Sequence, residues 1–147
     1  MEVRETRTDD ELTAALDLRE RVFCEEQGVS TEADRDGRDH EATHIVAVDD
    51  GRVIGTCRLL FRAGIARLGR LAVEPDRRGD GVGAAILREA DRVARDAGAD
   101  AISLHAQTYA KELYLRDGYL ERGPTFVEEG IEHVAMGKRL QPTRAPR

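Results

Sequence analysis

Aromatic residues and cysteine are scarce in this chain of 147 residues: aromatics make up 4%, tryptophan is absent and there are two cysteines. No apolar run approaches the roughly 20 residues that a membrane-spanning helix needs, and the first residues do not resemble a secretory signal. Cys24 and Cys57 lie far apart without metal-ligand neighbours, which indicates a reducing compartment rather than a disulfide framework. We therefore expect a cytoplasmic protein without membrane contact. The histidines lack the spacing of a metal site, so we expect no metal.

Positively charged residues are also fewer than negatively charged ones. The chain has 23 Lys and Arg residues and 29 Asp and Glu residues, which gives a net charge of −6. This balance disfavours nucleic acid as a partner. The length predicts one domain over residues 1–140, followed by a disordered tail over 141–147. Residues 25–41 are especially acidic, and they form either a solvated loop or a wall that attracts a cationic acceptor. The acidic side chains there are Glu25, Glu26, Glu32, Asp34, Asp36, Asp39 and Glu41.

The hydrophobic pattern predicts helices and strands in a mixed α/β order. A capping box at residues 8–11 begins a helix over 9–24, and Asp50-Gly51 marks a hairpin. The expected strands cover residues 2–7, 45–48, 53–61, 66–73, 101–107, 124–127 and 131–138. A helix opens within 78–84, buries Ile86, Ala90, Val93 and Ala97 on one face, and stops at Gly98; a shorter helix covers 108–117. Because the longer helix joins the strands at 66–73 and 101–107, we expect those strands to be parallel.

The stretch over residues 66–87, ARLGRLAVEPDRRGDGVGAAIL, organises the rest of the chain. Its strand stops before Pro75, and three glycines, Gly79, Gly81 and Gly83, open the helix. Because glycine has no side chain, several backbone N–H groups of this turn can point at one anion. The first N–H groups of a helix also have no partner within the helix. The sequence therefore predicts a phosphate or pyrophosphate site, with a plain flexible turn as the alternative.

The type of phosphate site follows from what surrounds these glycines. No Gly-Lys-Ser/Thr occurs, which excludes a P-loop. Residues 79–84 fit the dinucleotide fingerprint GxGxxA, but that fingerprint follows its strand directly, and Asp100 precedes the next strand instead of ending it. The alternative is Arg78-x-x-Gly81-x-Gly83. It resembles the [Q/R]xxGx[G/A] signature of the GNAT family of acetyl-CoA-dependent N-acetyltransferases.

Three further segments resemble the same family. Residues 107–119 (QxxAxxLYxxxGY) look like its second motif, and residues 18–27 (LRxxVFxxEQ) and 126–133 (FxEEGIxH) are similar to its ElaA-like branch. One departure is Glu132, where that branch tends to have proline. The resemblance runs from about residue 18 to 136, in the family's order of motifs. It implies a mixed α/β GNAT fold with six or seven strands and about four helices.

The resemblance also implies acetyl-CoA as the acyl donor. In this family the strands of the two motifs diverge, and the pantetheine arm lies between them. The backbone of Leu71, Ala72 and Val73 would then pair with the pantetheine, and the Val73 N–H would polarise the thioester carbonyl. Gln107 and Tyr114 belong to the same implied site. The diphosphate would be held by the turn formed by Arg78, Gly79, Asp80, Gly81, Val82, Gly83 and Ala84.

Tyr114 is the residue that we expect to act as general acid, because a phenol held near the sulfur can protonate the leaving thiolate. A buried core tyrosine is the alternative. The base stays open between His105 and Glu26. Histidine ordinarily titrates near pH 6.5, and His105 shares a strand face with Gln107, whereas Glu26 follows the first helix, in a loop that frames the acceptor side in this family. Competing candidates are Glu128, Glu129, His44 and His133.

The expected reaction is transfer of an acetyl group to a primary amine by direct attack in a ternary complex, because no nucleophile–base pair stands out for a covalent route. Two rivals stay open. One is an acyl-homoserine lactone synthase, which shares the LRxxVF opening and an acidic segment, and the other is a non-catalytic acyl-CoA-binding module. Fold does not specify the acceptor, although the acidic residues near Glu26 favour a cationic small-molecule amine. The sequence specifies no oligomeric state; a homodimer is the commonest assembly.

Overall fold

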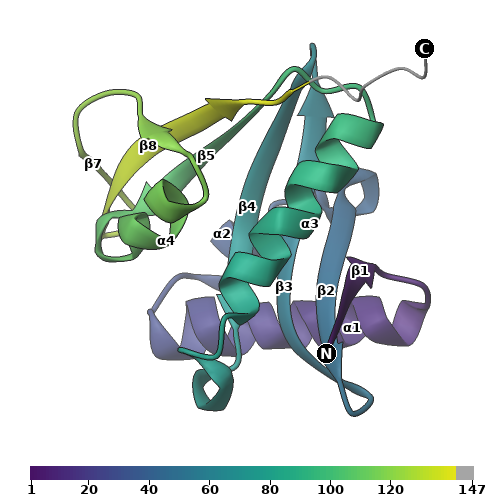
Figure 1. Ribbon diagram of the computed structural model, residues 1–147. Helices are drawn as coiled ribbons and strands as arrows, with labels where there is room; N and C mark the ends of the chain where they lie inside the picture. Colours follow the sequence, from purple (N-terminus) through teal and green to yellow (C-terminus); the bar gives the residue numbers. More distant parts are fainter. Residues whose placement is uncertain (142–147) are drawn as a thin grey trace, which may run out of the picture.

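The computed structural model describes residues 1–141 and shows one mixed sheet flanked by helices (Figure 1). The sheet has the spatial order β1-β2-β3-β4-β5-β8-β6, and β7 pairs with β8. Its strands are β1 (Glu2–Glu5), β2 (Thr43–Asp49), β3 (Arg52–Arg62), β4 (Ile65–Val73), β5 (Ala101–Gln107), β6 (Leu120–Glu121), β7 (Phe126–Glu128) and β8 (Ile131–Arg139). The α-helices are α1 (Asp9–Arg19), α2 (Thr31–Asp34), α3 (Val82–Asp96) and α4 (Lys111–Arg116). Shorter turns are the π-helix η1 (Glu20–Glu26) and the 3₁₀ segments η2 (Asp39–Glu41), η3 (Pro75–Arg77) and η4 (Thr108–Ala110).

The predicted mixed α/β architecture is confirmed, with four α-helices within residues 1–141. The sheet has eight strands instead of six or seven, because β6 spans only two residues and so offers no alternation to detect. The disordered tail predicted over 141–147 lies outside the described residues, Gln141 excepted. In this part of the chain, no helix combines the length and the apolar character needed to cross a membrane.

The first helix begins as its capping box predicts but ends differently. The Thr8 hydroxyl accepts the Glu11 N–H at 3.1 Å, and α1 starts directly after this cap. The predicted end at residue 24 is wrong, because α1 continues as the wider π-helix η1 through Glu26. Turns of this kind are uncommon and concentrate at functional sites. This one brings Glu26 to Arg78 and Gln27 to Gln107 at the end of β5.

Helices α3 and α1 pack on opposite faces of β2, β3 and β4. The face predicted for the long helix is confirmed for Ile86, Ala90 and Val93, which are buried. It is wrong for Ala97, which is exposed because α3 has already ended. A Cβ on Gly55 would lie 2.7 Å from the Cδ1 atom of Ile86, so α3 approaches β3 closely only because residue 55 is glycine.

Strands β4 and β5 are parallel, as predicted, but they pair over a short length. The pairing covers Ile65–Arg67 against Ala101–Ser103 and stops there. Beyond it, β4 contains a bulge at which its register with β3 shifts, and Arg70 adopts a positive φ of 58°. In Figure 1 the two strands meet near the top of the view and separate downward. The bulge thus opens the sheet between its two central parallel strands.

The acidic segment over residues 25–41 is docked against the sheet by three arginines. Arg19, whose side chain is 1% exposed, donates to Asp39 at 2.7 Å. The ion pairs join Arg19 to Asp34 and Asp39, Arg58 to Asp36 and Asp39, and Arg70 to Asp34 and Asp36. Glu26 and Glu41 also pair with arginines. The segment is therefore largely exposed, as a solvated loop would be, but its aspartates fix it to the sheet.

Candidate functional site

The opening between β4 and β5 presents backbone groups that no strand uses. The Glu74 N–H donates to the Ile54 carbonyl at 2.8 Å, so Glu74 faces β3. Peptide groups alternate along a strand, and those of Val73 therefore point away from β3, into the opening. The Val73 carbonyl accepts from the Arg78 Nε atom at 3.1 Å. The structure thus places the predicted segment Leu71, Ala72 and Val73 along one wall of the opening.

The glycine turn lies at the end of that wall. Gly79 and Gly81 have φ values of 86° and 83°, and a Cβ on either would meet nothing within 4 Å, so the turn is unobstructed. No side chain caps α3, and its first internal bond runs from the Ala85 N–H to the Gly81 carbonyl at 3.1 Å. The N–H groups over residues 82–84 consequently have no partner within the helix. The turn predicted over Arg78 to Ala84 therefore has the donors that an anion requires.

Tyr114 lies on α4, which follows the end of β5 after the short η4 turn. Its side chain is buried, with 8% exposure, and its ring packs edge to face against Tyr119 with centroids 5.9 Å apart. Burial raises the pKa of the Tyr114 phenol above its usual value of 10, and Cys57 and Tyr109 act in the same direction. The phenol accordingly stays protonated at neutral pH, which is the state that a proton donor needs.

Two glutamines bridge the mouth of the opening. The Gln107 amide donates to the Gln27 Oε1 atom at 2.8 Å, and the Gln27 amide donates back at 3.3 Å and to the Tyr109 hydroxyl at 3.0 Å. Gln107 ends β5, whereas Gln27 directly follows η1. Sequence reasoning placed Gln107 in the site but missed Gln27 and Tyr109. The only signal for Gln27 was its place in the LRxxVFxxEQ segment.

Glu26 reaches the same mouth but is already engaged. The Arg78 guanidinium donates to its two oxygens at 2.7 and 2.8 Å. These hydrogen bonds lower the pKa of the Glu26 carboxyl. A carboxylate with a lowered pKa is a weaker proton acceptor, so this arrangement makes Glu26 the poorer of the two candidate bases.

His105 lies in a polar group at the point where β4 and β5 part. Its Nδ1 atom is 3.2 Å from the Glu128 Oε1 atom, and the Arg67 Nη2 atom is 3.0 Å from its Nε2 atom. The His105 ring packs edge to face on Phe126, with centroids 4.9 Å apart, and Phe126 stacks on His133. The structure therefore unites three residues that were rival candidates for the base, His105, Glu128 and His133.

The remaining candidates lie elsewhere. His44 is buried, with its Nε2 atom 2.9 Å from the Asp39 carbonyl, and it thereby belongs to the docked acidic segment. Glu129 is exposed at the turn between β7 and β8. Cys57 is buried, as expected of a packing residue. Within residues 1–141 no cluster of three or more His, Cys, Asp or Glu residues could hold a metal ion.

Comparison with known proteins decides the family. Residues 5–140 match the family model described as Acetyltransferase (GNAT) domain.

This chain belongs to the GNAT family.

The resemblance seen in the sequence is thereby confirmed. The chain is 34% identical over 133 residues to a Bacillus subtilis (strain 168) protein named as the uncharacterized N-acetyltransferase YjcF, covering 90% of this chain and 95% of that protein. It is similar to the structure of an acyl-CoA N-acyltransferase from Pseudomonas aeruginosa, with a TM-score of 0.84, 27% identity, and coverage of 94% and 99% of the two chains. Escherichia coli ElaA has the same fold, with a TM-score of 0.83, 24% identity, and coverage of 93% and 98%.

Proposed function

We propose that this GNAT protein transfers an acetyl group from acetyl-CoA to the nitrogen of a primary amine. The observation that carries the proposal is the opening between β4 and β5, which ends at the unobstructed glycine turn. One extended ligand with a diphosphate at one end fits this arrangement: its arm lies along Val73, and its anionic groups lie at the start of α3. The P. aeruginosa relative named as an acyl-CoA N-acyltransferase supports this type of donor.

Acetyl-CoA supplies the acyl group as a thioester. The Val73 N–H is placed to donate to the thioester carbonyl, which makes its carbon more electrophilic. His105 takes a proton from the acceptor ammonium, and the free amine forms the new C–N bond. As the C–S bond breaks, Tyr114 donates its proton to the departing sulfur, the attacking nitrogen loses its second proton to solvent, and solvent returns a proton to the tyrosinate. No side chain becomes acylated, so the acetyl group passes directly from sulfur to nitrogen.

The proposal is tested with the purified full chain in two steps. Calorimetry with coenzyme A measures whether the opening and the turn bind the donor, and thiol release from acetyl-CoA in the presence of a panel of primary amines measures transfer. We expect saturable binding and amine-dependent thiol release. Binding without transfer to any amine would support the acyl-CoA-binding module instead. Transfer only from an acyl carrier protein, with S-adenosylmethionine, would support the lactone synthase.

The role of Tyr114 is tested by Tyr114→Phe. We expect kcat to fall about 100-fold, since general acid catalysis contributes roughly 10²–10⁴-fold, while affinity for acetyl-CoA is unchanged. Tyr119→Phe is the matched control. The Tyr119 hydroxyl is also buried and has no hydrogen-bond partner in the described chain, and its ring lies beneath the Lys138 ammonium, 4.7 Å from the ring centroid. Equal activity of the two variants would reject Tyr114 as the acid.

A further inference from the structure

We infer that the acceptor is an amine that carries a carboxylate about 10 Å from its nitrogen, and that a groove over β5 and β8 binds this carboxylate. This inference rests on the proposed function, because it places the reacting nitrogen beside His105. It reverses the cationic acceptor that the acidic sequence near Glu26 favoured. The observations are the shape of the groove, its unpaired arginines and its position relative to His105.

The groove has a volume of about 440 Å³ and lies on the side of the sheet that α1 occupies further along. Its floor is formed by small residues at neighbouring points of β5 and β8. The register pairs Ser103 with Gly137 and His105 with Ala135, and all four side-chain positions face the same side. The Ser103 hydroxyl makes no hydrogen bond to any residue over 1–141. A shallow floor with glycine, alanine and serine at these positions leaves room for an extended ligand.

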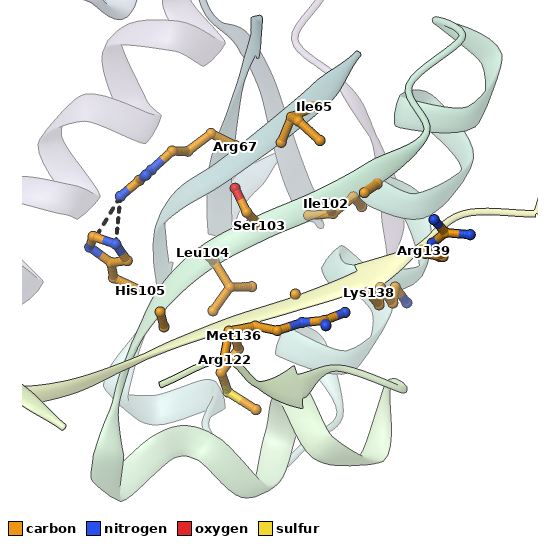
Figure 2. A pocket seen from close by; sticks show the side chains of 13 residues that line it. Ile65, Arg67, Ile102, Ser103, Leu104, His105, Arg122, Met136, Lys138 and Arg139 are labelled. Atoms are coloured by element: carbon orange, nitrogen blue, oxygen red, sulfur yellow. Dashed lines mark hydrogen bonds between the residues drawn. The ribbon is translucent and has the colours of Figure 1, made fainter. Parts of the chain in front are cut away.

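Arginines lie at both ends of the groove. At one end Arg67 contacts His105, and at the other the Arg122 side chain runs along β8 toward Lys138 and Arg139 (Figure 2). A Cβ on Gly137 would lie 3.6 Å from the Arg122 Nε atom, so Arg122 lies directly over the glycine.

Arg122 and Arg139 lack an acidic partner over residues 1–141, since neither has a carboxylate within 4 Å there. Lys138 differs, because it is held by Asp91 and Asp117 at 2.5 and 2.8 Å. In a chain of net charge −6, two guanidinium groups that line one groove without an acidic partner among the described residues form a site for an anion, and planar guanidinium groups match a carboxylate well.

Strand geometry gives the length of the ligand. His105 on β5 pairs with Ala135 on β8. Gly137 lies two residues beyond Ala135 along β8, and Arg139 lies four residues beyond it. At about 3.3 Å per residue, these positions are roughly 7 and 13 Å from His105. A carboxylate between Arg122 and Arg139 is therefore about 10 Å from a nitrogen at His105. Three residues of extended peptide span a similar length.

The same ligand affects Arg67. This guanidinium lies against both ring nitrogens of His105, at 3.0 and 3.1 Å, and so covers the nitrogen that would accept the substrate proton. A polar ligand along the groove gives Arg67 another partner. Binding of the acceptor would then free the imidazole at the moment when its base function is needed.

Triglycine and triglycinamide test the inference, because they share shape and amine and differ in the carboxylate. The first measurement omits acetyl-CoA: each peptide is titrated into ¹⁵N-labelled protein, and amide shifts are followed by NMR. We expect triglycine to shift Ser103, Gly137 and Arg139, and to bind at least about tenfold more tightly than triglycinamide. Arg122→Gln and Arg139→Gln should each remove this preference. Arg95→Gln is the control, since Arg95 lies on α3, across the sheet.

The second measurement is acetyl transfer to the same peptides. We expect kcat/KM to be at least about tenfold higher for triglycine, with the difference in KM, and to become equal for the two peptides in Arg122→Gln. Glycine, whose carboxylate cannot reach Arg122 or Arg139, should show no such advantage over glycinamide. Retention of the triglycine preference in both arginine variants would reject the groove as its source.

The two measurements separate this inference from the proposed function. If triglycine binds at the groove but neither it nor any other amine of the panel is acetylated, the proposed function fails and the anion site stands. If amines are acetylated without regard to a carboxylate and no groove amide shifts, the function stands and the inference is overturned. It is also overturned if sedimentation shows a dimer that Arg122→Gln dissociates while triglycine leaves the groove amides unchanged, because a second copy then covers this face.

Discussion

Two groups of arginines lie on one side of the same sheet and have opposite surroundings. The first group consists of Arg19, Arg58 and Arg70, and the second of Arg122 and Arg139. Arg58 on β3 donates to Asp36 and Asp39 at 2.9 and 3.0 Å, beneath the docked acidic segment. Arg122 and Arg139, over β8, have no carboxylate within 4 Å in the described chain. The first group completes the fold, whereas the second leaves positive charge at the surface. The difference shows that the role of a charged residue depends on which residues pack over it, and not on its amino-acid type.

The position of the acidic segment produces this difference. The segment follows η1, and its aspartates contact β2, β3 and the bulge of β4, where His44, Arg58 and Arg70 lie. It contacts β5 through Gln27 at Gln107, where that strand ends, and so leaves the groove over β5 and β8 uncovered. Burial of the first group makes each of its ion pairs costly to break, while solvent screens the second group and leaves it free to exchange partners.

The largest expected difference between the groups is in stability. Arg19→Ala removes the most buried member of the first group and leaves Asp34, also 1% exposed at its side chain, without its closest charge partner. We expect a loss of about 3–5 kcal/mol in the free energy of unfolding, measured by urea denaturation. Arg122→Ala is the control, with an expected change within about 0.5 kcal/mol. Similar losses for both variants would show that the two groups do not differ.

A smaller effect is expected from acid. Hydrogen bonds from Arg58 lower the pKa of Asp36, and the pKa of Asp39 is also lowered, although burial opposes the bonds from Arg19 and Arg58. The unfolded chain thus takes up protons near pH 4, where the folded chain does not, so this stabilisation is complete above about pH 5 and is lost as pH falls below 4. Asp36→Asn should cost about 1–2 kcal/mol at pH 7 and progressively less toward pH 3. A cost that is independent of pH would contradict the ion-pair account.

The smallest effect concerns the second group alone. Triglycine at a concentration equal to its Kd should stabilise the protein by about 0.4 kcal/mol, seen as a rise of roughly 1–2 °C in Tm. Arg139→Gln should abolish the rise, whereas Arg95→Gln should retain it. If the rise in Tm persists without Arg139, the peptide binds at another place. The second group of arginines would then not be a ligand site.

Much of the fold was accessible from local patterns. The capping box at Thr8, the Asp50-Gly51 hairpin and the alternation of β5 each act over a few residues, and each prediction is confirmed. The two-residue strand β6 was not predicted, because it is defined only by its pairing with β8. The continuation of α1 into η1 also escaped, since a π-helix has no side-chain period that distinguishes it from an α-helix at this length.

The candidate site divides in the same way. The glycine turn and Tyr114 belong to contiguous motifs and could be named from the sequence. The link between Gln27 and Gln107 joins residues 80 positions apart, and the contact of His105 with Glu128 joins two strands that only β8 brings together. The docking of the acidic segment was not predicted for a related reason: the arginines that hold its aspartates to the sheet lie on α1, β3 and β4, outside the segment.

By itself, the sequence determined the order of helices and strands, the family and the turn that opens α3, because each depends on neighbouring residues and on backbone conformations that glycine permits. Only the tertiary structure decided which charges are neutralised and which remain available. Electrostatic interactions depend on distance and burial, and these are set when α1, the acidic segment and β8 take their places around the sheet.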